Sequence, residues 1–258
     1  MRRRNRTNEV MAISEHELIA MTNDLEQIHY DVGMPAMESA IDEWTERSRT
    51  SRRGFLVGAG AVAGGAALLA VGTGGPAAWA GTTKGSKTAK LKGDLAVAAL
   101  AAGLENLAVA AYGDVLAAAT AGKLGSVPPA VATFATTVKA QHAQHAQAWN
   151  SAIVAAGHKA ITTTDPVLTP IVVADFKKVK NVVGAAKLAL VLENDAAATY
   201  QSAISAVKAT SSVKVAASIQ PVELQHAAIL NFVLGQYPVP NAFSPLKGAR
   251  PLTDYTKG

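Results

Sequence analysis

Residues 104–112 read LENLAVAAY, and residues 192–200 read LENDAAATY. Each copy places Leu-Glu-Asn in an alanine-rich apolar run, with a tyrosine seven positions after the glutamate. Alanine is the strongest intrinsic helix former, so both stretches indicate helices. A carboxylate on an apolar helix face is costly unless it is protonated, paired or bound to a cation. One such glutamate could sit at the edge of its apolar face and reach solvent, but the repeat predicts a function for both Glu105 and Glu193.

The pattern of apolar residues and helix breakers predicts an all-α fold. We expect four long helices over residues 93–121, from Pro128 or Pro129 to Gly157, 182–208 and 212–235, with a short connecting helix over 171–180. Two short connections and one long one suit an antiparallel four-helix bundle with a long crossover between helices two and three. The tail over 236–258 holds four prolines and is expected to lie over the bundle as coil.

Helices two and four carry related motifs, QHAQHA at 141–146 and VELQHA at 222–227. The pairs His142/His145 and Glu223/His226 are each three residues apart, so both members of a pair leave the same helix face. A lone histidine is more often a satisfied core or surface residue. Three of the four histidines after residue 80 lie in these two motifs, however, and each glutamate of the repeat lies on another helix. The pattern predicts a metal site.

One glutamate on each of two helices and Glu-x-x-His on each of the other two form the di-metal carboxylate signature of the ferritin-like superfamily. From about residue 90 to 235, the chain resembles bacterial ferritin-like domain proteins with LE…Y in helices one and three. The resemblance implies one terminal pair for each metal and one bridge: Glu105 with His145, Glu193 with His226, and Glu223 bridging.

His142 departs from this pattern, because it stands where the family's second bridging glutamate is expected. A neutral histidine has one free lone pair and cannot bridge two cations as a carboxylate does. An asymmetric pair bridged by Glu223 and hydroxide, a single metal, and a site without oxygen chemistry remain open. The three His and three Glu favour Fe, Mn or Zn over Ca or Mg. Tyr112 and Tyr200 could donate electrons or hydrogen-bond the ligands, or serve in packing alone.

The composition excludes several kinds of site. The absence of cysteine excludes disulfides, thiolate metal sites and a cysteine nucleophile. Residues 1–80 hold 8 Lys/Arg against 10 Asp/Glu, and residues 81–258 hold 16 against 9. This positive charge is scattered lysine, so it indicates a solvated face and no nucleic-acid partner.

The stretch SRRGFL at 51–56 resembles a twin-arginine translocation signal, with Arg52 and Arg53 as the paired arginines. A Gly/Ala-rich apolar run follows, and Ala78 and Ala80 provide the small residues that signal peptidase accepts. We expect cleavage after Ala80, with a retained membrane anchor as the alternative. The resemblance implies export by the twin-arginine translocase to the cell envelope or the outside.

The sequence therefore divides into five parts: an N-terminal cytoplasmic extension (1–50), the signal peptide (51–80), a linker (81–92), a ferritin-like bundle (93–235) and a tail (236–258). Later methionines leave open where translation starts. We expect an exported protein that binds iron or a similar metal, with ferroxidase or peroxide-reducing activity among the implied possibilities. The alternatives are a non-catalytic envelope or stress-related bundle, whose metal is structural or lost, and a helical module that binds a partner through its tail. The sequence indicates neither substrate nor oligomeric state.

Overall fold

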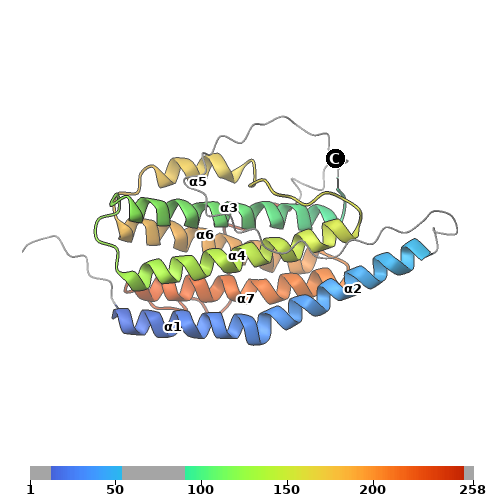
Figure 1. The fold of residues 1–258 in the computed structure, drawn as a ribbon, viewed down its shortest axis with the longest axis horizontal. Coiled ribbons are helices and arrows are strands. Elements are labelled where there is room, and N and C mark those ends of the chain that lie inside the picture. The colour runs from blue at the N-terminus through green and yellow to red at the C-terminus, as the bar shows by residue number, and fades with distance from the viewer. Residues whose placement is uncertain (1–12, 54–90, 253–258) are drawn as a thin grey trace, which may run out of the picture.

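The computed structural model describes residues 13–53 and 91–252, and within these ranges no strand occurs. Four long helices lie side by side (Figure 1): α3 (Asp94–Thr120), α4 (Pro129–Ala155), α6 (Val182–Ala206) and α7 (Thr210–Val233). The all-helical prediction is confirmed for these residues. The predicted signal motif beyond Arg53, the cleavage residues Ala78 and Ala80, and most of the linker lie outside them.

The ends of the helices follow from local chemistry. Pro129 begins α4, where its missing N–H would have no intrahelical partner. Beyond the last residue of α4, Gly157 adopts φ +87°, and its N–H and that of His158 bond back to Val154 and Ile153. Only glycine adopts this backbone at no steric cost. At the start of α6, the Asn181 side chain accepts a hydrogen bond from the backbone of Gly184 at 2.8 Å.

The connection between α4 and α6 contains α5 (Leu168–Phe176), which begins and ends earlier than the predicted 171–180. The Asp165 carboxylate explains the earlier start, because it accepts hydrogen bonds from the backbone N–H of Val167 and Leu168 at 2.9 and 2.7 Å. Asn106, the asparagine of the first repeat, donates to the backbone oxygen of Ile161 at 2.9 Å. The first Leu-Glu-Asn therefore ties the connection to α3.

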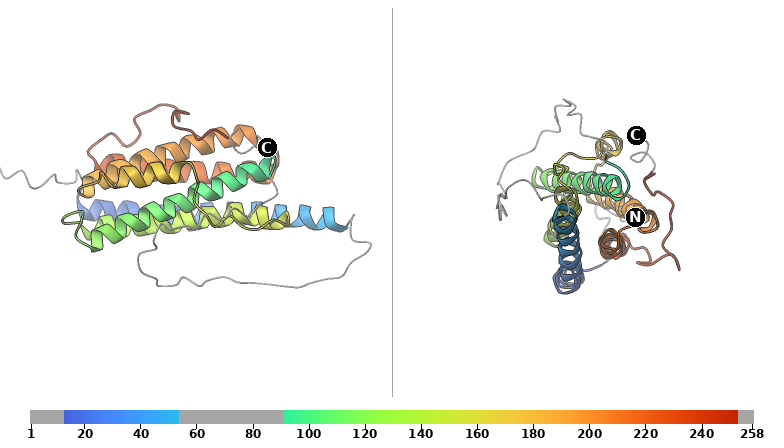
Figure 2. Two further views of the ribbon diagram at one scale, coloured as in Figure 1. Left: turned by 90° about the horizontal axis from the view of Figure 1, so that it is seen from above. Right: turned by 90° about the vertical axis from the view of Figure 1, so that its right-hand side faces the viewer.

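The N-terminal residues form an arm against the bundle: α1 (Glu15–Ile28), the π-helical turn η1 (His29–Gly33) and α2 (Met34–Arg53). The arm starts with a capping box, in which Ser14 and Glu17 bond each other's backbone N–H. Seen end on, α1 and α2 lie outside the four-helix group (Figure 2), and they contact α4 and α7. Their inward residues Leu18, Leu25 and Met37 are buried, so residues 13–46 pack as part of the folded domain.

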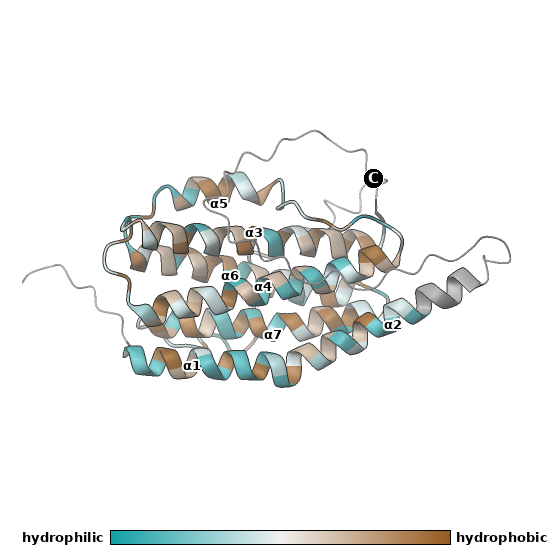
Figure 3. Ribbon diagram, viewed as in Figure 1, coloured by the Kyte–Doolittle hydropathy of each residue, from teal (hydrophilic) through white to brown (hydrophobic). Residues whose placement is uncertain are grey.

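α3 is long and apolar enough to cross a membrane by length and composition alone, judged over the described residues. Figure 3 shows it mainly white to brown, whereas teal residues are common on α1 and α2. More than half of its most apolar window is buried inside the fold, and it also contains the buried Glu105. These features are typical of the core helix of a bundle.

The docking of the arm gives a stability prediction. Replacing the fully buried Leu18 with alanine should lower the free energy of unfolding by about 2–5 kcal/mol, because it leaves a cavity between the arm and the bundle. Chemical denaturation of the full chain measures this. The neighbouring Ile19 is 42 % exposed, and its change to alanine should cost no more than about 0.5 kcal/mol. Equal, small effects of the two substitutions would show that the arm does not pack as described.

Candidate metal centre

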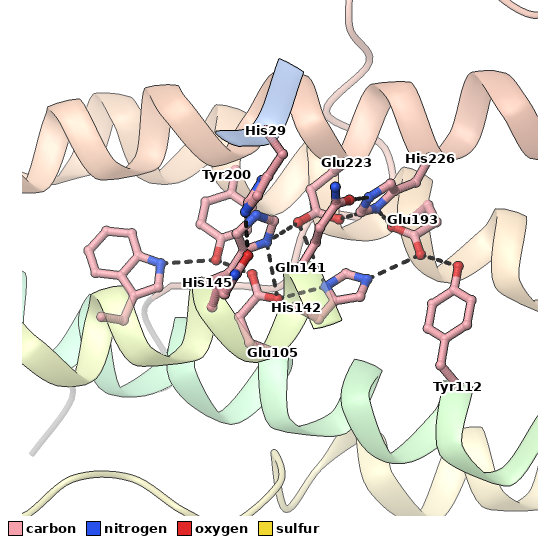
Figure 4. Close-up of polar contacts among 12 residues, drawn as sticks. His29, Glu105, Tyr112, Gln141, His142, His145, Glu193, Tyr200, Glu223 and His226 are labelled. Carbon is pink, nitrogen blue, oxygen red and sulfur yellow. Dashed lines mark hydrogen bonds and ion pairs between the residues drawn. The ribbon is translucent and has the colours of Figure 1, made fainter. Parts of the chain in front are cut away.

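The four long helices bring six polar side chains together in the interior of the bundle (Figure 4). They are the residues predicted from the sequence: Glu105, His142, His145, Glu193, Glu223 and His226. None is more than 3 % exposed. Their ligand atoms form two overlapping groups of four, and within each group all atoms lie within 4.8 Å of one another. Both groups contain His142 and Glu223, so these two residues join the halves.

The first half contains Glu105, His145 and the two shared residues. His145 Nδ1 lies 3.1 Å from Glu223 Oε1 and 3.6 Å from Glu105 Oε2. Neither oxygen of Glu223 accepts a hydrogen bond, and His145 Nδ1 makes none either. Buried polar atoms in folded proteins almost always have a partner, and those without one point to an absent water or ion. The atoms of this half that make no hydrogen bond face one another at ion-pair distance, as ligands of a shared cation also would.

The second half contains Glu193, His226 and the two shared residues. His226 Nδ1 lies 3.1 Å from Glu193 Oε2 and 3.5 Å from Glu223 Oε2. Its other ring nitrogen, Nε2, donates to Gln141 Oε1 at 2.7 Å. Metal-binding histidines commonly donate their second N–H to such a partner, which fixes the tautomer and the ring. Gln141 therefore leaves Nδ1 of His226 as the atom available to a metal.

His142 lies between the two halves. Its Nδ1 is 2.7 Å from Glu105 Oε2, and its Nε2 is 3.3 Å from Glu193 Oε1. Each ring nitrogen thus faces the repeat glutamate of a different half. His142 stands where the family's second bridging glutamate is expected, at the centre of the cluster. Its imidazole ring donates to the carboxylates of both Glu105 and Glu193. A metal entering either half would displace one of these protons.

The tyrosines of the repeat reach across the bundle. Tyr112, which shares α3 with Glu105, donates its hydroxyl to Glu193 Oε1 at 2.5 Å. Tyr200, which shares α6 with Glu193, donates to Glu105. Both tyrosines hydrogen-bond glutamates of the cluster, and each contacts the glutamate of the other repeat. The two copies of the repeat therefore lie on α3 and α6, and the tyrosine of each copy hydrogen-bonds the glutamate of the other.

Three further residues complete the surroundings, and sequence reasoning did not single them out. Gln141 opens the QHAQHA motif, so the motif itself contained this signal. Trp149 donates its indole N–H to the Tyr200 hydroxyl at 2.9 Å. His29, from η1 of the arm, donates to Gln144, and its ring centroid lies 5.9 Å from that of His145. Nothing in the sequence placed the arm beside α4, so no pattern could have indicated His29.

The six side chains compensate one another's charge. Burial alone would lower the pKa of His145, but Glu105 and Glu223 raise it to about 9. Burial is likewise outweighed at His142 and His226, whose pKa values rise because of the carboxylates beside them. Burial opposes ionisation of Glu105, yet His145 and His142 lower its pKa to about 2. Without metal, charged histidines therefore pair with charged glutamates.

The pKa of His29 shifts in the opposite direction, because this ring faces the histidine side of the cluster. Its burial, followed by the charge of His145, lowers the pKa of His29 to about 4. The ring is therefore neutral at pH 7. His29 therefore packs the arm against His145 without adding another charge to the cluster.

These shifts predict how the stability of metal-free protein depends on pH. A raised histidine pKa stabilises the fold fully below about pH 6.5, and this contribution is lost as the pH rises through the folded value. The melting temperature of chelator-treated protein should therefore fall between about pH 6.5 and 9, the range set by His145. The lowered pKa of Glu105 contributes above about pH 4.5, and its contribution is lost as the pH falls towards 2.

The variant His145→Gln should flatten the alkaline part of this melting profile. The matched control is His158→Gln, in the exposed loop after α4, which should leave the slope unchanged. An unaltered slope in His145→Gln would contradict the charge pairing described for the cluster.

Comparison with known proteins agrees with this geometry. A family model described as a ferritin-like domain matches residues 93–236, which is more than half of the 258 residues. No curated protein and no solved structure matches the chain. The matched span contains all six clustered residues and the four helices that carry them. The chain belongs to the ferritin-like domain family.

Proposed function

We propose that the protein binds iron, or a similar transition metal, at the Glu/His cluster inside a ferritin-like four-helix bundle whose halves are joined by the long connection through α5. The observation that carries this proposal is Glu223, a fully buried carboxylate with no hydrogen bond to either oxygen, placed between two further Glu/His pairs. Without metal, this carboxylate is stabilised by ion pairs with His145 at 3.1 Å and His226 at 3.5 Å but accepts no hydrogen bond, and a buried charge without hydrogen bonds is costly. A cation between the halves would satisfy it.

The donor set fits a transition metal. Glu105 with His145 would hold one ion, Glu193 with His226 would hold a second, and Glu223 would bridge them. Metal–ligand bonds of about 2.0–2.2 Å put opposite ligand atoms about 4 Å apart, so the observed spread of the ligand atoms requires only small side-chain movements. Imidazole together with carboxylate favours Fe, Mn or Zn over Ca or Mg. Bound iron would supply one-electron chemistry towards oxygen or peroxide.

The protein's own groups would orient the site and hold its protons. Tyr112 and Tyr200 fix one oxygen of Glu193 and Glu105, respectively, which leaves the other oxygen of each carboxylate directed at the histidines. His142 can retain one N–H bond to a carboxylate while the other half binds metal. The surrounding apolar helices exclude bulk water, which strengthens each of these interactions.

A second function is favoured by the charge balance. Three histidines with raised pKa face three glutamates, so the cluster is close to neutral with no metal at all. In this reading the residues form a buried ion-pair network in a non-catalytic envelope or stress-related bundle. Metal analysis distinguishes the two functions.

For the metal-binding function, Glu223→Gln should abolish binding at both positions, because it removes the one carboxylate that the halves share. Glu105→Gln and Glu193→Gln should each remove mainly one position. We would measure the metal content of full-length protein incubated with Fe(II), Mn(II) or Zn(II), together with thermal melting. Metal at 100 times Kd should stabilise the wild type by about 2.7 kcal/mol, a gain that Glu223→Gln should lose.

The control for this experiment is Glu38→Gln, at an exposed position on α2, which should bind and melt like the wild type. If the wild type takes up none of the three metals and its melting does not change, the ion-pair network is the function of the cluster.

We further propose that the protein is exported through the twin-arginine route, on the strength of the SRRGFL motif. Replacing Arg52 and Arg53 together with lysine should leave full-length protein in the cytoplasm, because the translocase reads the arginine pair. Cell fractionation and mass spectrometry measure this, with a mature N-terminus expected at Gly81. The matched control replaces Arg47 and Arg49, on the same helix but outside the motif. Normal export of the Arg52/Arg53 variant would exclude this route, and an unprocessed chain in the membrane fraction would favour the anchor.

A further inference from the structure

Three aromatic side chains form a row from the arm to the candidate metal centre. The ring centroids of Trp44, on α2, and Trp149, on α4, are 6.2 Å apart. Those of Trp149 and Tyr200, on α6, are 6.3 Å apart, with only 13° between the ring planes. Both separations are those of rings in contact. Trp149 is fully buried, whereas Trp44 is partly exposed, so the row runs from the surface into the core.

Hydrogen bonds extend this row to the cluster. Trp149 Nε1 donates to the Tyr200 hydroxyl, and that hydroxyl donates to Glu105 Oε1 (Figure 4). The phenol proton thus already points at a carboxylate that can accept it. Tyr112 provides a natural contrast: it also donates to a ligand glutamate, but its ring contact is with His142 at 5.7 Å. Among the described residues, the ring of Tyr112 contacts no indole.

We propose that Trp44, Trp149 and Tyr200 form a path for single electrons between a soluble reductant and the metal centre. The proposal rests on metal binding at the cluster, as proposed above. It assigns these residues a role in long-range electron transfer. In a chain that retains residues 1–80, it also gives the arm a function, because the outer end of the path lies on α2.

The path balances electrons and protons at each step. With an oxidised metal ion held at the cluster, Tyr200 would lose one electron to it, and the phenol proton of Tyr200 would move along the existing hydrogen bond to Glu105. Trp149 then reduces the tyrosyl radical, and the proton returns from Glu105 to the phenol oxygen. Trp44 reduces Trp149 and is itself reduced by a small one-electron donor in solution. The net change is one electron transferred to the metal, with the aromatic residues restored.

The first test starts from the inside of the path. Full-length protein loaded with Fe(II) would be treated with hydrogen peroxide and no added reductant, so that radicals accumulate. Freeze-quenched samples should show a tyrosyl radical by electron paramagnetic resonance, and peptide mass mapping should find oxygen added at Trp149 and Trp44. Tyr200→Phe should lose both signals. Trp149→Phe should keep the tyrosyl radical and lose the oxidation of Trp44.

Tyr237→Phe is the matched control, since it removes a hydroxyl from a tyrosine of the tail that is 74 % exposed, and it should keep the radical and the tryptophan oxidation. Equal oxidation of Trp44 in the wild type and Tyr200→Phe would overturn the path. If Trp149→Phe does not fold, the comparison of Tyr200→Phe with Tyr237→Phe still decides, because each variant removes one hydroxyl and retains the ring.

The second test needs no metal and starts from the outside. A light-generated one-electron oxidant would be used with chelator-treated full-length protein. Exposed tyrosines should contribute an equal radical signal in every variant. Above that signal, the wild type should show a further tyrosyl radical that is absent from both Tyr200→Phe and Trp44→Phe. If this further radical forms in a protein that binds no metal, the path stands and the proposed metal-binding function is wrong. No dependence on Tyr200 or Trp44 would overturn the path itself.

Discussion

Six ionisable side chains share a space that the rest of the chain makes apolar, and this constraint determines much of the structure. A buried charge is tolerated only when it is paired or binds a cation. Each of the four long helices therefore has to bring its charged residues to the same level of the bundle. Moving any one helix by a turn would separate a glutamate from its histidines. The cluster thus specifies the register of the helices as well as a chemical site.

Alanine makes this convergence possible. Ala98, Ala102 and Ala198 are buried at the helix interfaces, where a small side chain lets the helices approach closely. Larger side chains are confined to particular places, such as Trp149 in one apolar cluster and Phe134 in another. The hydrogen bonds of Tyr112 to Glu193 and of Tyr200 to Glu105 then join α3 to α6. Helix packing and ligand placement are consequences of the same pattern of small and polar residues.

The sequence predicted those features that depend on one helix alone, namely where a helix ends and which residues share a face. Breakers such as Pro129 and Gly157 marked the ends of α4, and three-residue spacing placed His142 with His145. The order of glutamates and histidines also brought together the six residues that the structure clusters. Their role as metal ligands remains a proposal, as does export.

Contacts between distant segments were beyond such reasoning. The arm was expected only as an N-terminal extension, because an amphipathic helix does not indicate which surface it will cover. Its docking on α4 and α7 brings Trp44 to Trp149 and His29 to His145. The crossing of the tyrosines depends in the same way on the relative placement of α3 and α6. Cleavage after Ala80 would cut the chain between the arm and the bundle. The arm would then be held to the bundle only by its non-covalent contacts.

The most direct test of the central claim is anomalous X-ray diffraction from crystals of the full-length protein loaded with Fe(II) or Mn(II). The account predicts anomalous peaks within about 2.0–2.3 Å of ligand atoms from Glu223 and at least one of the pairs Glu105/His145 and Glu193/His226. Well-ordered crystals with no anomalous peak at these six side chains would contradict it.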